Sequence, residues 1–288
     1  MLHLKENVSG NTNIRTRIQK VSNFIDYIDD KFREHFTPDS EISIDEFIIK
    51  LKGKISFITY NPNKPNKWGI GIYVLSDART GYIYAMLPYY GSVNTECLIR
   101  PDFPVSSKIV LQVYQKLLNA NPEAKGYHIF TDRYFTGIPL AEELSNLKCY
   151  LTGTIRTNRR YIPDMMRKPA LTTNNNVAAS RSGDILLLAW KDKRVVTILS
   201  SYDTSSIKTV QRRRKEGGIV SISKPNVIVK YNINMGGIDK TDQLASSYCF
   251  LRKFVINNYI LYKVSGRRVN HTPMFHLFCP EIGETTGS

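Results

Sequence analysis

The feature that most constrains the fold is the order of hydrophobic segments between residues 42 and 155. Segments with the character of β-strands come first, and segments of helical and of strand character then alternate. Three segments are rich in β-branched and aromatic residues and are separated by the turn-forming sequences NPNKPNK and DARTG, namely Ile42–Ile49, Trp68–Ser76 and Gly81–Tyr89. Segments of helical and of strand character then alternate, namely Val105–Leu118, Gly126–Thr131, Ile138–Leu147 and Tyr150–Ile155. We therefore expect three strands followed by helix, strand, helix and strand.

This order of elements is that of the ribonuclease H-like fold, an α/β class with a mixed sheet and helices packed on its faces. In such a fold, side chains at the ends of adjacent strands converge on one edge of the sheet. Before this region, Ile14–Phe32 repeats apolar residues at helical spacing and predicts an amphipathic helix that ends before Pro38.

After Arg156 the pattern weakens, and we interpret this region as an insertion that is largely β-strand and loop. Residues 172–176 (TTNNN) and 180–183 (SRSG) are typical of loops, and residues 211–218 (QRRRKEGG) of a basic turn. Ile185–Trp190 and Arg194–Ser200 are predicted to form a hairpin pair.

Composition favours a folded protein with a polyanionic partner. The 288 residues are 42% hydrophobic, enough to fill one large domain or two smaller ones. Lys and Arg outnumber Asp and Glu by 40 to 25, which gives a net charge of +15 and favours nucleic acid as the partner over an unpartnered basic protein. The four cysteines are too dispersed for a zinc module or a disulfide framework, which suits a reducing compartment. No apolar run reaches membrane-spanning length and the polar N-terminus is no signal peptide, so we expect an intracellular protein with no membrane partner.

Four aspartates are candidates for a site that binds divalent cations. Asp239 and Asp242 follow a Gly-Gly pair, and if a helix starts there, their spacing puts both on one face. Such a pair by itself is more often a helix cap than a metal site. Asp45 lies in the first predicted strand, and Asp132 follows the apolar run GYHIF. Nucleases and strand transferases hold two divalent ions with carboxylates, and Mg²⁺ prefers such oxygen ligands.

Other assignments of the acids stay open at this point. Asp45 can equally be a turn or edge residue, with Glu46 beside it as the functional acid, and Asp132 can cap the following helix. Asp77 and Asp203 also follow apolar strands, and periodicity alone does not separate them from the candidates.

Four blocks of the sequence resemble the piggyBac-type transposases, in that family's order and over roughly residues 14 to 265. The first is ISIDEF with the later KPNKWGIGIYVLSDARTGY, similar to the family's SIDE, P-x-KP-x-KWGIK and D-x-xTGY elements. IFTDRYFTGIPLAEEL resembles its DNWFTS-x-PLA element, with Arg133 and Tyr134 in place of the usual Asn and Trp. LTGTIRTNRRYIP resembles its GT-x-R-x-N motif, and YNINMGGIDKTDQL its YN-x-x-x-GGVD-x-x-DQ.

The resemblance implies a ribonuclease H-like transposase core with a two-metal site that uses Mg²⁺ or Mn²⁺. Carried over residue by residue, Asp45, Asp132 and Asp239 match the three catalytic aspartates, and Asp242 matches an accessory metal ligand. The implied chemistry is nicking at transposon ends, hairpin formation and joining into TTAA targets, which makes double-stranded DNA the partner. A homodimer and a nuclear location are further expectations.

By analogy with the family, nine basic side chains are candidates for phosphate contacts, which position DNA without reading its sequence. These are Arg156, Arg159, Arg160, Lys64, Lys67, Arg212, Arg213, Arg214 and Lys215. A solvated surface charge is the alternative for each, and the RRRK run is also compatible with nuclear import.

The resemblance divides the chain into five parts. Residues 1–40 match the last piece of the family's N-terminal dimerisation and DNA-binding region, and 41–158 the first part of the catalytic core. Residues 159–228 are the insertion, 229–265 the last part of the core with a shortened helix, and 266–288 an irregular tail. The family's long N-terminal region, an internal Trp-rich helical stretch and its Cys-rich C-terminal module have no counterpart in this sequence.

Two functions follow as hypotheses. The four acids favour a core that retains metal-dependent DNA cleavage and strand transfer. The lost segments favour a truncated or domesticated derivative that binds DNA or partner proteins without catalysis. A basic nuclease of unrelated purpose fits the composition but not the four ordered blocks.

Overall fold

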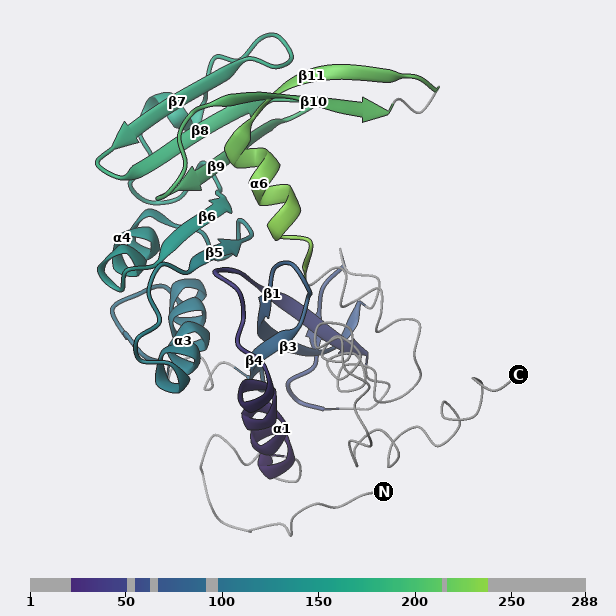
Figure 1. Ribbon diagram of the computed structural model, residues 1–288, viewed down its shortest axis with the longest axis vertical. Coiled ribbons are helices and arrows are strands. Elements are labelled where there is room, and N and C mark those ends of the chain that lie inside the picture. The colour runs from purple at the N-terminus through teal and green to yellow at the C-terminus, as the bar shows by residue number, and fades with distance from the viewer. Residues whose placement is uncertain (1–21, 51–54, 63–66, 92–97, 214–216, 238–288) are drawn as a thin grey trace.

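The computed structural model describes residues 22–50, 55–62, 67–91, 98–213 and 217–237 (Figure 1). Its described helices are α1 (Ser22–His35), α3 (Val105–Ala120), α4 (Ile138–Asn146), α5 (Asp164–Arg167) and α6 (Asn226–Asn234). Its described strands are β1 (Glu41–Lys50), β2 (Thr59–Tyr60), β3 (Trp68–Asp77), β4 (Ile83–Pro88), β5 (His128–Thr131), β6 (Tyr150–Thr154), β7 (Val177–Ser182), β8 (Ile185–Lys191), β9 (Val195–Ser200), β10 (Ile207–Arg213) and β11 (Ile219–Pro225).

The predicted order of elements is confirmed, and it builds one mixed sheet. The strand order is β2-β3-β1-β5-β6-β9-β8-β7, with β4 also paired to β3. β1, β3 and β4 form an antiparallel meander, whereas β5 and β6 run parallel to β1 because α3 and α4 return the chain to the same end of the sheet. All four residues of β5 are buried, as expected for a central strand of a parallel arrangement. The fold is ribonuclease H-like.

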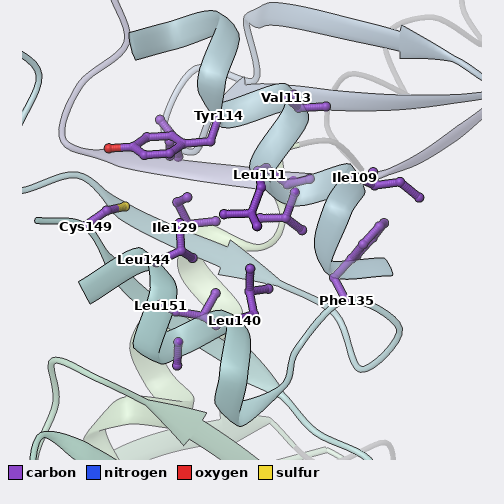
Figure 2. Close-up of a cluster of buried hydrophobic side chains, with 14 of the residues drawn as sticks. Ile109, Leu111, Val113, Tyr114, Ile129, Phe135, Leu140, Leu144, Cys149 and Leu151 are labelled. Atoms are coloured by element: carbon purple, nitrogen blue, oxygen red, sulfur yellow. The ribbon is translucent and has the colours of Figure 1, made fainter. Parts of the chain in front are cut away.

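One face of the sheet packs against α3 and α4 and forms the largest core (Figure 2). Ile109, Val113 and Leu117 are four residues apart and therefore lie on one side of α3. This side faces the sheet, and each of the three residues is 0–1% exposed. Leu140 and Leu144 do the same for α4, and both are fully buried. Because this face is sealed by two helices, the functional residues of the sheet lie on the opposite face or at its edge.

The opposite face is covered by α1 at one end and by α6 at the other (Figure 1). Ile28 and Phe32 of α1 pack on the side chains of β1, β3 and β4, including Phe47. Val227 and Ile228 of α6 pack on β8 and β9. Strand alternation assigns Phe47 and the other odd-numbered residues of β1 to this second face.

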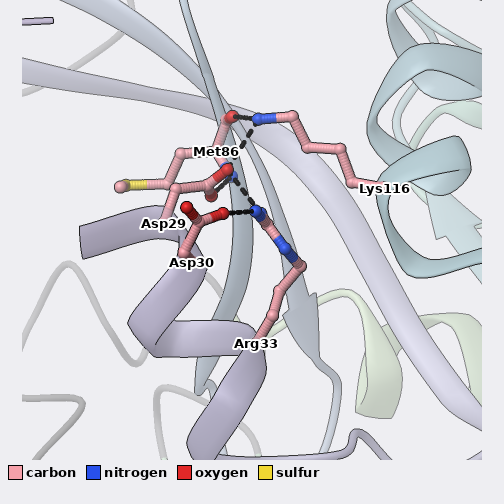
Figure 3. Close-up of polar contacts among 5 residues, drawn as sticks. All are labelled: Asp29, Asp30, Arg33, Met86 and Lys116. Carbon is pink, nitrogen blue, oxygen red and sulfur yellow. Dashed lines mark hydrogen bonds and ion pairs between the residues drawn. The ribbon is translucent and has the colours of Figure 1, made fainter. Parts of the chain in front are cut away.

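A buried polar cluster connects α1 to the sheet and to α3 by hydrogen bonds (Figure 3). Asp29 is 4% exposed, and its carboxylate accepts hydrogen bonds from the Met86 amide at 2.8 Å and from Lys116 Nζ at 2.7 Å. The same Lys116 ammonium donates to the Met86 carbonyl at 2.6 Å, and Arg33 pairs with both Asp29 and Asp30. A buried carboxylate with these partners has its charge compensated, so α1 is joined to the core by specific contacts as well as by apolar packing.

The region predicted to be an insertion, residues 159–228, continues the sheet of the core. The predicted hairpin pair is confirmed as β8 and β9, and β9 pairs antiparallel with β6, so β9, β8 and β7 extend the same sheet. The prediction of a loop at 180–183 is wrong for Ser180–Ser182, which belong to β7 because the backbone of β8 pairs with each of them. Likewise, residues 211–213 of the predicted basic turn end strand β10, and β10 and β11 form a separate two-stranded ribbon. Among the described residues, no helix is long and apolar enough to cross a membrane.

Candidate active site

Asp45 of β1 and Asp132, the residue directly after β5, lie at the same level of the sheet. The register places Ile44 of β1 opposite Thr131 of the parallel strand β5, so the next residue along the chain is an acid in both cases. Adjacent strands are about 4.8 Å apart, and alternation assigns both carboxylates to the face shared by α1 and α6. Both residues are half-buried. The sheet therefore brings together two of the four predicted acids.

A tight turn after β5 fixes Asp132. The Tyr134 amide donates to Asp132 Oδ1 at 2.8 Å, and the Thr136 hydroxyl donates to the Asp132 carbonyl at 2.8 Å. The hydroxyls of Thr131 and Thr136 are 2.8 Å apart, which ties the turn back to the strand. Gly153 of β6 lies against this turn, where any side chain would collide with both threonines. The turn is thus held by hydrogen bonds on one side and by close packing on the other.

Thr154 and Tyr231 add two hydroxyls to the same edge. Thr131 pairs with Gly153, so Thr154 follows at the level of Asp132 on the next strand. The Tyr231 hydroxyl from α6 lies 3.3 Å from Thr154 Oγ1. Burial raises the pKa of Tyr231 to about 12, and the negative charges of Asp132 and Asp45 contribute to the rise. The phenol is therefore protonated at neutral pH and close to both acids.

Asp239 and Asp242 lie outside the described residues, as does the predicted helix beyond the glycine pair. The structure describes the approach to them: α6 ends at Asn234, and Gly237 follows against the end of β3. A Cβ atom at Gly237 would stand 3.1 Å from the carbonyl oxygens of Asp77 and Ala78, which is tighter than ordinary contact, so glycine favours this close approach.

The alternative acids have other surroundings. Alternation places Glu46 on the face opposite Asp45, where its charge acts on Tyr134. Asp77 accepts hydrogen bonds from the Thr80 amide at 2.7 Å and hydroxyl at 2.6 Å, which close the turn after β3. Asp203 is 5% exposed and forms an ion pair with Lys230 at 2.7 Å. Asp77 and Asp203 thus have partners within the fold.

The carboxylates of Asp45 and Asp132 are of the ligand type that a hard divalent cation binds. Carboxylate oxygens are the ligands that Mg²⁺ prefers, and Mg²⁺ needs only one or two of them because it keeps several waters. Within the described residues, no group of three or more His, Cys, Asp and Glu side chains is placed to hold a metal ion. Two of the four predicted ligands fall outside this range.

The predicted phosphate-binding residues fall into three groups. Lys64, Arg214 and Lys215 lie outside the described residues. Arg156, Arg160, Lys67 and Arg213 are exposed. Arg159 and Arg212 have protein partners, described next.

Arg159 is half-buried and donates to the carbonyl of Tyr134, in the turn that carries Asp132. Burial, and then the charge of Arg156, lower the pKa of Arg159. Arg212 makes two hydrogen bonds of 3.0 Å to the carboxylate of Asp192, which offsets part of its charge. Of the exposed candidates, Arg212 is bound to a carboxylate, and Arg156, Arg160, Lys67 and Arg213 are therefore the most accessible to a phosphate backbone.

Comparisons with known proteins agree with the sequence resemblance. The family described as Transposase IS4 matches residues 1–261. The human PiggyBac transposable element-derived protein 3 is 25% identical over 256 residues, and the human PiggyBac transposable element-derived protein 2 is 24% identical over 260. A solved structure described as a piggyBac transposase synaptic complex with hairpin DNA matches 91% of this chain and 56% of its own, with a TM-score of 0.72 and 26% identity. The chain belongs to the piggyBac-type transposase family.

The region that matches the two human relatives covers 86% of this piggyBac-type chain, but only 41% and 42% of the relatives themselves. The matched part of the chain therefore spans about two fifths of the length of these curated relatives. The match to the solved piggyBac transposase covers the ribonuclease H-like sheet described above.

A buried network of polar residues in this piggyBac-type core was not predicted from the sequence. A chain of buried hydrogen bonds runs from His128 Nε2 to Thr152 at 2.8 Å, from Thr152 to Ser200 at 2.7 Å, and from Ser200 to Asp203 at 3.3 Å. Asp203 then binds Lys230, the residue before Tyr231. Periodicity gave no signal for these residues, because they lie on four different elements. Gly153, Thr154 and Tyr231, which lie at the acidic edge, belong to the GT and YN sequence blocks. Their place in these blocks was the signal by which they could have been predicted as site residues.

Proposed function

We propose that this chain is the catalytic core of a piggyBac-type transposase that cleaves and transfers DNA strands with Mg²⁺ or Mn²⁺. One observation carries the proposal: Asp45 and Asp132 follow paired residues on adjacent parallel strands, at the same edge of a ribonuclease H-like sheet. Together with Asp239 they are the proposed catalytic aspartates, and all three with Asp242 are the proposed metal ligands.

Each described residue has a role that follows from its surroundings. The Asp132 turn is rigid, so its carboxylate stays in place as a ligand when DNA arrives. The protonated Tyr231 hydroxyl is a hydrogen-bond donor at the same edge, beside Thr154. When bound, two divalent ions supply activation of the attacking oxygen and stabilisation of the leaving oxygen. The exposed guanidinium groups of Arg156 and Arg160 neutralise phosphates of the bound strand.

The proposed partner is double-stranded DNA, with transposon ends as the substrate and TTAA sequences as the target. Support comes from the net charge of +15 and from the solved relative described as a complex with hairpin DNA. Homodimerisation and nuclear location are proposed from the family alone. The remaining candidates, Lys64, Lys67, Arg159, Arg212, Arg213, Arg214 and Lys215, are proposed as further phosphate contacts.

A nicking assay tests the proposal. The full chain is incubated with transposon-end and hairpin DNA in Mg²⁺ or Mn²⁺, beside Asp45→Ala, Asp132→Ala and the control Asp184→Ala, which changes an exposed carboxylate in the turn between β7 and β8. We expect the first two variants to lose nicking while they keep DNA affinity, and the control to nick like the unmodified chain. Nicking by Asp132→Ala, or no nicking by the unmodified chain, contradicts the catalytic proposal.

The second candidate is a transposase-derived protein that binds DNA or protein partners without cutting. It is favoured by the two human relatives, both of which are described as transposable element-derived proteins. The same assay separates the two functions, since salt-sensitive DNA binding without metal-dependent nicking supports this one.

A further inference from the structure

Two large aromatic side chains stand exposed at the edge of the sheet. Tyr60 of β2 and Trp68 of β3 are a cross-strand pair, with ring centroids 4.5 Å apart and ring planes tilted by 38°. They are 53% and 54% exposed. The other tryptophan, Trp190, is 2% exposed and belongs to the packed interior. Aromatic rings in contact with water at this level offer their flat faces to a partner.

The aromatic pair lies on the same face of the sheet as Asp45. Residues 45, 47 and 49 of β1 share one face, and Ile49 pairs with Ile70 of β3. Trp68 is two residues from Ile70 and therefore shares that face, as does its direct partner Tyr60. The register places Trp68 one residue beyond Lys50, so about six residues of strand, or roughly 20 Å, separate the pair from Asp45.

A lysine adjoins the pair at the start of β3. Lys67 directly precedes Trp68 and is exposed, whereas alternation assigns Lys50 of β1 to the other face of the sheet. Aromatic rings beside lysines are the arrangement by which proteins hold single-stranded nucleic acid, because bases stack on the rings and phosphates contact the ammonium groups. Bases within a duplex are stacked on each other, so only unpaired bases can use the faces of these rings.

We propose that Tyr60 and Trp68 form a stacking platform for unpaired bases of a DNA strand whose phosphates contact Lys67. This rests on the proposed function, since strand cleavage is what generates unpaired nucleotides. The platform lies beyond the part of this face that α1 covers, where Phe47 and Ile72 are buried, and it takes no part in the bond-breaking step.

Tryptophan fluorescence tests the platform directly, since Trp68 and Trp190 are the two tryptophans of the chain. In a Trp190→Phe background, emission comes from Trp68, and a stacked base quenches it. We titrate the full chain in EDTA with a twelve-nucleotide oligothymidylate and with a blunt duplex of equal length. We expect saturable quenching by the single strand and much weaker quenching by the duplex.

Affinity measurements on variants complete the test. Removing one stacking ring weakens binding by about 5- to 100-fold, so Tyr60→Ala and Trp68→Ala should each lower single-strand affinity by about tenfold in fluorescence anisotropy with a labelled oligonucleotide. Trp68→Phe keeps an aromatic face and should retain most of the affinity. Tyr27→Ala removes an equally exposed ring on α1 and should change nothing.

Several outcomes overturn the platform. These are unchanged affinity in Trp68→Ala, binding without quenching in the Trp190→Phe background, and equal quenching by duplex and single strand. Trp68 emission that depends on protein concentration without DNA, together with dimers in sedimentation, assigns the patch to a protein interface instead. The assay contains no metal and can be repeated with Asp132→Ala. Loss of nicking and loss of stacking are therefore measured independently.

Discussion

Gly153→Ala is the substitution for which the structure predicts a specific effect on the site. The added methyl carbon would lie 2.2 Å from Thr136 Oγ1, 2.5 Å from the Thr131 carbonyl oxygen and 2.7 Å from Thr131 Oγ1. The Thr136 hydroxyl can rotate away only by giving up its hydrogen bonds to Thr131 and to the Asp132 carbonyl. The Thr131 carbonyl belongs to β5, which is paired on both sides, so it cannot rotate away at all.

The size of the effect follows from these distances. A carbon and an oxygen in contact need a separation of about 3.4 Å, so the backbone at Thr131 must move by roughly 1 Å. Overpacking of this kind costs about 1–3 kcal/mol of the free energy of unfolding. Asp132 follows Thr131 directly and shares its displacement. A misplacement of about 1 Å of a group that acts on the substrate lowers a rate by about 100-fold.

Urea unfolding followed by circular dichroism measures the first effect, and nicking at saturating DNA measures the second. The matched control is Gly137→Ala, which also changes a glycine next to the site. At Gly137 the backbone is extended, with φ −163°, and the nearest atom to an added methyl would be 4.0 Å away. Equal stability and nicking in the two alanine variants would refute the packing argument. The stability comparison stands even for a chain that does not cut DNA.

Three further predictions address stability and DNA binding. Asp29→Ala should lower the free energy of unfolding by about 3 kcal/mol, because it leaves buried cationic partners uncompensated; in urea unfolding, Asp30→Ala, whose side chain is 71% exposed, should change it by less than about 0.5 kcal/mol. Burial lowers the pKa of His128 from 6.5 to about 4, so between these values the unfolded chain binds a proton that the native chain does not. Stability should therefore fall by about 3 kcal/mol as the pH drops through this window, and unfolding curves at pH 7 and 4.5 should lack this component in His128→Gln. Arg156→Ala should reduce the salt slope of duplex binding by about one, whereas Arg212→Ala should reduce it less because a carboxylate already binds that guanidinium; equal slopes would contradict this.

The order of elements in the core could be predicted because each has a clear hydrophobic period and clear turn residues at its ends. The same rules failed at Ser180–Ser182, where glycine and serine indicated a loop. Strand β7 forms there because β8 offers an unpaired backbone, and that is a contact between segments that no local pattern contains. The helix α6 was missed for a related reason: its sequence NVIVKYNIN is rich in β-branched residues, and its packing on β8 and β9 determines its structure.

Within the site, the sequence could place Asp45 in the first strand and Asp132 at the end of the apolar run that becomes β5, and the fold class predicts that the ends of adjacent strands converge. It could not show that Glu46 faces the other side of the sheet, because that depends on which residues of β1 pack under α1. Nor could it find Tyr231, whose position depends on the angle at which α6 crosses the sheet.

That crossing angle is set by the insertion as much as by the core. α6 contacts β1, β6 and β9, and β9 belongs to the inserted strands. Ser200, at the end of β9, accepts a hydrogen bond from the Asp203 amide at 3.0 Å and holds the carboxylate that binds Lys230 of α6. From the other side, Thr152 of β6 joins Ser200 to the core. The next residue of α6, Tyr231, meets Thr154 at the acidic edge. β9 and the turn after it, which lie in the predicted insertion, therefore help to hold α6 over the two acids. The segment with Asp239 and Asp242 follows the end of this helix.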